Sequence, residues 1–112
     1  MKKILFVYGS LSHLHLSGMA SYLHKFVYKK EEAKVRGKLI YKDGYPALIN
    51  EGKGVVKGFL LHFRNSPQLM KKLDFYEGAG YKRATLLIEC KTHKIKGEAY
   101  VLKGQVFDTH VN

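Results

Sequence analysis

The chain has one cysteine, Cys90, among its 112 residues. A single cysteine excludes an internal disulfide, and by the same count we expect no thiolate zinc site. Cys90 follows the apolar residues 86–88. This setting favours a packed strand thiol over a reactive one, since a nucleophilic cysteine needs an electropositive and partly exposed environment. The absence of disulfides is typical of the cytosol, so we expect a cytoplasmic protein.

Long apolar runs are also missing. No run approaches the roughly 18 residues that a membrane helix needs, so we expect no membrane partner. The five apolar residues at positions 4–8 are too few for the core of a signal peptide. With 46% hydrophobic and 26% charged residues, the chain has an ordinary globular composition. We therefore expect one globular domain over residues 1–112.

Acidic residues are scarce: 9 Asp and Glu oppose 20 Lys and Arg, for a net charge of +11. Such a surplus can mark a nucleic-acid interface. However, 17 of the basic residues are Lys scattered along the chain, and only Arg36, Arg64 and Arg83 carry a guanidinium. A solvated basic face explains this pattern better than nucleic-acid binding. A non-catalytic module that binds nucleic acid or another anionic partner remains the alternative function.

The hydrophobic pattern predicts six strands and two helices. Residues 3–8 form a first strand that ends at Gly9. Apolar residues at 16, 19, 20 and 23 have helical spacing. From residue 26 the period becomes two and continues to 41, Asp43-Gly44 indicates a turn, and extended segments follow at 45–50 and 55–63. The second segment is apolar on both faces, as inside a closed or doubly covered sheet.

Ser66-Pro67 predicts the start of a second helix, which ends near Glu77 before Gly78. Two strands follow at 82–90 and 95–102. The order β-α-β-β-β-α-β-β with short connections predicts an α+β fold, in which a small mixed or antiparallel barrel-like sheet is flanked by two helices.

Several common sites are missing from the sequence. Gly78-Ala79-Gly80 follows a helix rather than a strand, so it is no dinucleotide fingerprint, and no phosphate loop with Gly-Lys-Ser/Thr occurs. His13 and His15 lack a third ligand at matching spacing. Ser10 has no Asp/His signature of a nucleophile, so we interpret its hydroxyl as a cap or ligand. We therefore expect neither metal nor cofactor.

Glu77 has helical spacing with Met70 and Leu73, so it lies on the stripe of core-type residues. Three effects disfavour its charge: partial desolvation, the negative end of the helix dipole, and Asp74 one turn back. We therefore expect a raised pKa, which suits proton transfer. A glutamate that bends out to solvent past Gly78 is the other interpretation, and the helical spacing alone favours it.

The first strand ends in Tyr8-Gly9-Ser10-Leu11. A turn at Gly9 directs the next amides toward one spot near the following helix, and such N–H donors suit a carboxylate or an oxyanion. A strand that ends in Gly-Ser is also a common structural turn.

Five short segments in this order resemble the gamma-glutamylcyclotransferase-like family, which includes the gamma-glutamylamine cyclotransferases. They span most of the chain: Phe6-Val7-Tyr8-Gly9-Ser10-Leu11, Gly44-Tyr45-Pro46-Ala47, Val56-Lys57-Gly58-Phe59-Leu60, Leu73-Asp74-Phe75-Tyr76-Glu77-Gly78 with Tyr81 and Arg83, and Gly97-Glu98-Ala99-Tyr100.

The resemblance implies a small mixed barrel with flanking helices. It implies that Glu77 is the catalytic acid/base, that the amides of residues 8–11 (Tyr8, Gly9, Ser10 and Leu11) bind the glutamyl substrate, and that Tyr45 and Tyr81 contact it. The reaction would release 5-oxoproline from a small γ-glutamyl compound without a cofactor. A related cyclisation or amide-bond cleavage is a further alternative. Residues 12–16 depart from the family's Gly- and Asn-containing pattern in a region that borders the site.

Overall fold

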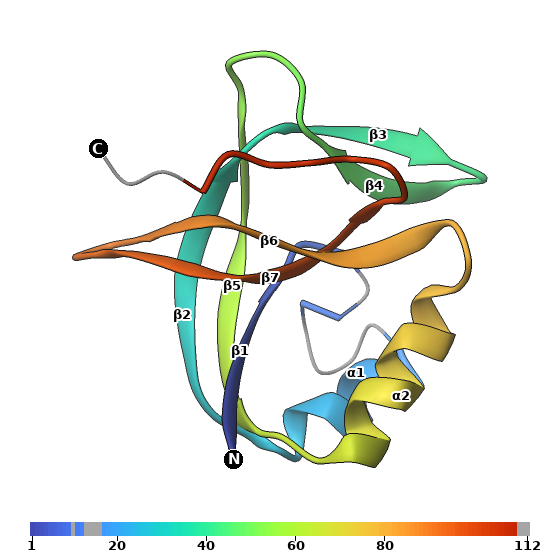
Figure 1. Cartoon of the computed structure of the whole chain (residues 1–112). Helices are drawn as coiled ribbons and strands as arrows, with labels where there is room; N and C mark the ends of the chain where they lie inside the picture. The colour runs from blue at the N-terminus through green and yellow to red at the C-terminus, as the bar shows by residue number, and fades with distance from the viewer. Residues whose placement is uncertain (10, 13–16, 110–112) are drawn as a thin grey trace.

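Five strands close into a barrel in the computed structural model, which describes residues 1–9, 11–12 and 17–109. Around the barrel the strands follow the order β1 (Lys2–Val7), β5 (Val55–Arg64), β2 (Val27–Arg36), β6 (Tyr81–Cys90) and β7 (Lys94–Leu102). β7 meets β1 in parallel and closes the barrel, whereas the other neighbouring strands are antiparallel (Figure 1). The barrel is therefore mixed.

Two helices and a hairpin complete the architecture. α1 (Gly18–His24) and α2 (Pro67–Glu77) lie side by side next to the barrel, and β3 (Lys38–Lys42) pairs with β4 (Tyr45–Ile49) in a separate two-stranded sheet (Figure 1). Within the described residues, no helix is long and apolar enough to cross a membrane. The architecture confirms the predicted α+β fold with two flanking helices.

β1 and β5 are buried on both faces, because the barrel interior lies on one side and the helices on the other. Phe6 and Leu60 point into the barrel interior. Leu5 and Leu61 point the opposite way and pack with Leu73 of α2. This alternation follows from the two-residue period of a strand, and it explains why the segment 55–63 is apolar on both faces.

α2 begins and ends at the predicted residues. The side chain of Ser66 accepts a hydrogen bond from the Leu69 N–H at 3.1 Å, and Pro67 occupies the first turn. At the other end Gly78 has a φ of 85°, and its N–H donates to the Asp74 carbonyl. Glycine adopts this left-handed conformation without strain, so the helix ends directly after Glu77.

α1 starts at Gly18, two residues after the first residue of the predicted apolar stripe. Ser17 is its N-cap and accepts a hydrogen bond from the Ala20 N–H at 3.0 Å, while Ala20 and Leu23 are buried. Leu16, the first residue of the predicted stripe, lies outside the described residues, as do Ser10, His13 and His15.

The extended segment predicted over residues 26–41 is wrong in one respect: it forms two strands in different sheets. The chain turns at Gly37, whose φ is 152°, and a Cβ atom there would lie 2.8 Å from the Ile49 carbonyl oxygen. The two-residue period continues through the turn, so hydrophobic spacing alone did not reveal it. Asp43 and Gly44 both have positive φ, as a tight hairpin turn requires.

Gly58 provides a test of the barrel packing, because β1 passes against its backbone. A Cβ atom there would lie 2.2 Å from the Val7 carbonyl oxygen and 2.8 Å from Cζ of Phe6. We expect Gly58→Ala to lower the free energy of unfolding by about 2–3 kcal/mol, at the upper end of ordinary overpacking costs. Urea denaturation followed by circular dichroism measures this change.

Gly18→Ala is the matched control, since nothing lies within 4 Å of a Cβ there and the residue belongs to α1. This substitution is expected to leave stability unchanged or to raise it by up to about 1 kcal/mol. Equal stability of Gly58→Ala and the wild type would show that β1 and β5 do not pack as described.

Candidate active site

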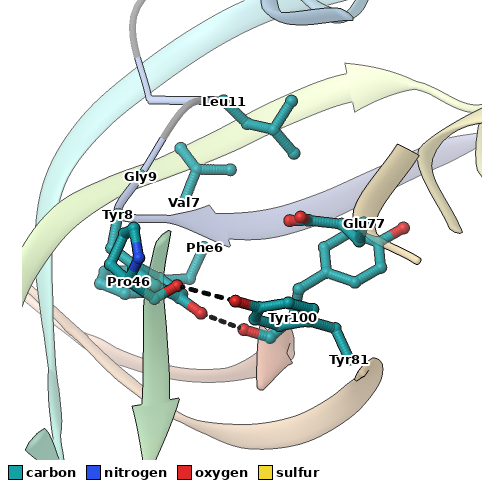
Figure 2. A pocket seen from close by; sticks show the side chains of 9 residues that line it. All are labelled: Phe6, Val7, Tyr8, Gly9, Leu11, Pro46, Glu77, Tyr81 and Tyr100. Atoms are coloured by element: carbon teal, nitrogen blue, oxygen red, sulfur yellow. Dashed lines mark hydrogen bonds between the residues drawn. The ribbon is translucent and has the colours of Figure 1, made fainter. Parts of the chain in front are cut away.

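A pocket opens where β1 ends, beside the last residue of α2. Its wall combines apolar and aromatic side chains with one carboxylate, as Figure 2 shows. The described lining residues are Phe6, Val7, Tyr8, Gly9, Leu11, Pro46, Glu77, Tyr81 and Tyr100. They come from β1 and the loop after it, β4, α2, β6 and β7, so the pocket exists only in the folded barrel.

Glu77 is the only carboxylate among the described lining residues. It is the last residue of α2, and its half-buried side chain is directed into the pocket rather than out past Gly78 (Figure 2). Burial raises the pKa of Glu77 to about 7. The carboxyl group is therefore present in both protonation states near neutral pH, as a proton-transfer group requires.

The rise in the pKa of Glu77 agrees with the expectation, but its cause is simpler. We expected Asp74 to contribute by charge repulsion, whereas burial accounts for the shift. The carboxylate of Asp74 does not contribute because it is paired with Arg83. It accepts hydrogen bonds from Nε and Nη2 of Arg83 at 2.9 and 3.2 Å. An ion pair of this bidentate kind compensates the charge of Asp74.

The Asp74–Arg83 pair belongs to a larger network that attaches the end of α2 to the barrel. Asp74 also accepts a hydrogen bond from the Tyr100 hydroxyl at 2.7 Å. Arg83 reaches Glu98 at 3.3 Å, and Glu98 in turn pairs with Lys3 at 2.9 Å. β6, β7 and β1 thus hold the last turn of α2, which carries Glu77.

Three tyrosines surround the carboxylate of Glu77. The Tyr8 hydroxyl donates to the Tyr100 carbonyl at 2.6 Å and accepts from the Leu48 N–H at 3.2 Å. The Tyr81 hydroxyl donates to the Pro46 carbonyl at 3.4 Å (Figure 2). Burial raises the pKa of Tyr8, Tyr81 and Tyr100 above the ordinary phenol value. The charge of Glu77 adds to this rise for Tyr8 and Tyr81, and the hydrogen bond to Asp74 adds to it for Tyr100. These phenols therefore stay protonated near neutral pH and act as hydrogen-bond donors, not as bases.

The loop after β1 makes a tight turn beside the pocket. The Ser12 N–H donates to the Gly9 carbonyl at 2.9 Å, and the Ser12 carbonyl accepts from Nζ of Lys30 at 2.6 Å. Gly9 lies against Pro46, whose Cγ would be 3.3 Å from a Cβ at position 9. A residue larger than glycine would therefore crowd the Pro46 ring in this wall of the pocket.

The structure brings together five of the seven residues predicted for the site: Tyr8, Gly9, Leu11, Glu77 and Tyr81. Tyr45 is not among the described lining residues; it lies at the start of β4 with 67% of its surface exposed. Ser10 lies outside the described residues, so the predicted role of its amide stays a prediction.

Four lining residues were missed: Phe6, Val7, Pro46 and Tyr100. Each lies within one of the five short segments that carry the family resemblance, which was the available signal. Tyr100 was the hardest to find, because it is 3% exposed and lines the pocket from the last strand. Its place beside Glu77 follows from the parallel pairing of β7 with β1, which local sequence patterns do not specify.

A family model described as gamma-glutamyl cyclotransferase, AIG2-like, matches residues 5–111 of this chain. A search of curated proteins returned no significant match. The fold is similar to the solution structure of an Arabidopsis thaliana protein, with 24% identity and a TM-score of 0.75 over 94% of this chain and 71% of that one.

Two crystal structures are also similar. YkqA from Bacillus subtilis has 25% identity and a TM-score of 0.73, over 92% of this chain and 36% of that one. An AIG2-like protein from Mus musculus has 18% identity and a TM-score of 0.68, over 91% of this chain and 78% of that one. The chain thus spans about a third of the Bacillus protein and about three quarters of the other two.

The family match covers nearly the whole chain, and it confirms the resemblance drawn from the five short segments. The chain belongs to the AIG2-like gamma-glutamyl cyclotransferase family, and at the level of that family its function is gamma-glutamyl cyclotransferase-like.

Proposed function

We propose that this chain cyclises the γ-glutamyl group of a small amide, amine conjugate or dipeptide to 5-oxoproline and releases the amine, with Glu77 as general acid and base. One observation carries the proposal: Glu77 projects into an aromatic pocket, and burial raises the pKa of its carboxyl group to about 7. A group whose pKa lies near the working pH can both accept and donate a proton in one cycle.

The reaction begins with the substrate's α-ammonium group. The carboxylate of Glu77 takes a proton from it, and the free amine attacks the side-chain carbonyl carbon of the same glutamyl group. A new C–N bond closes a five-membered ring, and the carbonyl becomes a tetrahedral oxyanion. Glu77 then passes this first proton to the departing nitrogen, and the original amide C–N bond breaks. The ring nitrogen gives up its second proton through the same carboxylate, and the released amine takes it up. Over the cycle the ammonium nitrogen gives up two protons and the leaving amine gains two.

The protein's main task in this reaction is to hold a folded substrate. Nucleophile and electrophile belong to one molecule, so fixing a conformer in which they touch removes most of the entropic barrier. The phenol hydroxyls of Tyr8 and Tyr81 already bond to the backbone, which keeps their rings fixed as walls of the pocket. A rigid aromatic wall suits the compact conformer that ring closure needs.

The amides of residues 9–11 are the proposed oxyanion and carboxylate donors. The turn closed by the Ser12 N–H and the Gly9 carbonyl supports this assignment, since Gly9 and Leu11 line the pocket. Preorganised N–H donors stabilise charge that develops in the transition state.

The net charge of +11 also favours the approach of an anionic substrate. A cytoplasmic location fits the unpaired thiol of Cys90.

Replacing Glu77 tests the proposed acid/base role. We expect Glu77→Gln to lower kcat for 5-oxoproline release by at least about 100-fold, because general acid–base catalysis contributes about 10²–10⁴-fold. A panel of γ-glutamyl amines, amides and dipeptides, with 5-oxoproline measured by chromatography, provides the assay. Glu51→Gln, at an exposed glutamate outside the described pocket lining, is the matched control and should retain full activity. Undiminished turnover by Glu77→Gln would rule out the assignment.

The pH dependence of stability tests the raised pKa independently of the substrate. Between the ordinary glutamate value of 4.5 and about 7, the folded protein holds a proton on Glu77 that the unfolded chain has lost. Stability must therefore fall as the pH rises through this window. After allowance for partial exposure, the fall attributable to Glu77 is on the order of 2 kcal/mol.

Glu77→Gln lacks this titration. The free energy of unfolding of the variant, relative to that of the wild type, should therefore rise as the pH increases through the same window. Urea denaturation of both proteins at about pH 4.5 and pH 7.5 measures the difference. In the wild type, kcat/KM should also rise with pH through about 7, because the base must be deprotonated. Parallel stability curves for the two proteins would mean that Glu77 is not desolvated.

A further inference from the structure

A second group of chemically reactive side chains lies at the other end of β6. Glu31, Cys90 and His93 each offer one ligand atom, and these atoms all lie within 4.8 Å of one another. β6 carries Tyr81 at its first residue and Cys90 at its tenth, and a strand rises about 3.3 Å per residue. The cluster is therefore about 30 Å from the start of β6, where the pocket lies. Figure 1 shows the β6–β7 turn on the side of the barrel away from α2.

Local geometry brings Cys90 and His93 together. They flank the two-residue turn between β6 and β7, and the Cys90 N–H donates to the His93 carbonyl at 2.8 Å. Residues that flank such a turn are direct cross-strand neighbours, with side chains on the same face. The chain thus presents a Cys-x-x-His pair on a short, rigid hairpin.

The register of β2 adds the third side chain. β2 pairs with β6 so that Ala33 lies opposite Cys90. Glu31 precedes Ala33 by two residues and so shares its face. Cys90 and Ala33 both belong to the barrel core, with Cys90 7% exposed. The three ligand atoms therefore meet at the rim of the barrel interior.

His62 holds the carboxylate of Glu31 in place. Nε2 of His62 and Oε2 of Glu31 are 2.6 Å apart, and this hydrogen bond lowers the pKa of the Glu31 carboxyl. Lys29 approaches the same oxygen at 3.8 Å but is 57% exposed on its side chain, so it can turn into solvent. Both contacts involve Oε2, and a carboxylate oriented by an outer partner in this way is typical of metal ligands.

The donor set suits zinc. Thiolate sulfur, imidazole nitrogen and carboxylate oxygen are its usual ligands, and in a tetrahedral site neighbouring donor atoms lie about 3.3–3.6 Å apart. Side-chain rotations that bring the atoms about 1 Å closer would meet that geometry. One thiolate and one carboxylate also balance the two positive charges of the ion, which favours a partly buried site.

We propose that Glu31, Cys90 and His93 bind a zinc ion at this end of the barrel, with His62 orienting Glu31. The ion would join β2 to the β6–β7 hairpin and thereby fix the rim. We had expected no thiolate zinc site because the chain has one cysteine, but a mixed site needs only one. Residues 31 and 90 are too far apart in the sequence for ligand spacing to reveal the pair.

Titration of the untagged full-length chain tests the site. After treatment with a chelator and dialysis, the protein is titrated with Zn²⁺ against a competing chelator, and separately with Co²⁺. We expect one equivalent of Zn²⁺ to bind and to raise Tm, since an ion that binds only the folded state stabilises it. Bound Co²⁺ should show a thiolate-to-metal charge-transfer band and the intense visible bands of a tetrahedral site.

Single substitutions identify the ligands. Cys90→Ser should abolish the charge-transfer band and weaken Zn²⁺ binding by more than about 100-fold, beyond the roughly 10–100-fold expected for the outer residue in His62→Ala. His93→Ala replaces an exposed side chain and serves if Cys90→Ser does not fold. Glu31→Gln should weaken binding, whereas Glu32→Gln, on the exposed opposite face of β2, is the matched control and should not.

Two results would overturn the proposal: a Co²⁺ spectrum without a thiolate band, or wild-type affinity for Zn²⁺ in both Cys90→Ser and His93→Ala. Neither readout involves the cyclotransferase reaction. Failure of the zinc site would therefore leave the proposed role of Glu77 untouched, and the reverse also holds.

Discussion

The position of Glu77 depends on one interaction, the bidentate ion pair between Asp74 of α2 and Arg83 of β6. It attaches the last turn of the helix to the barrel, and the Tyr100 hydroxyl joins it from β7. The same pair compensates the charge of Asp74, so that burial is the cause of the raised pKa of Glu77. The network thus fixes the position of the carboxyl group, while burial in the pocket sets its proton affinity.

Features of the fold that depend on neighbouring residues were predictable from the sequence. Ser66 and Gly78 delimit α2 because capping is a local matter of hydrogen bonds and backbone conformation. The apolar residues on both faces of β5 correctly indicated a strand covered on both sides. The break at Gly37 was not predictable from hydrophobic spacing, because the alternating pattern continues across it. The φ of 152° and the close approach of the Ile49 carbonyl require glycine there, and both appear only in the folded structure.

The residues of the site were only partly predictable from the sequence. Helical spacing placed Glu77 on a buried stripe but left its direction open, and only the packed structure directs it into the pocket. Tyr100 and Pro46 were missed because tertiary packing, not sequence distance, brings them to the end of β1. Barrel closure places β7 beside β1, and β4 of the separate hairpin packs against β7. Tyr45 shows the opposite difficulty: it lies in a family segment, yet its side chain is exposed while its neighbour Pro46 lines the pocket.

The barrel separates two polar groups of different chemistry. Between Glu77 at one end of β6 and Cys90 at the other, the interior is filled by apolar side chains such as Phe6, Leu60 and Ile88. Charged groups this far apart interact weakly at physiological ionic strength. A small barrel can therefore keep the pocket of Glu77 at one end while cysteine, histidine and glutamate converge at the other. Hairpin geometry and strand register alone produce that second convergence.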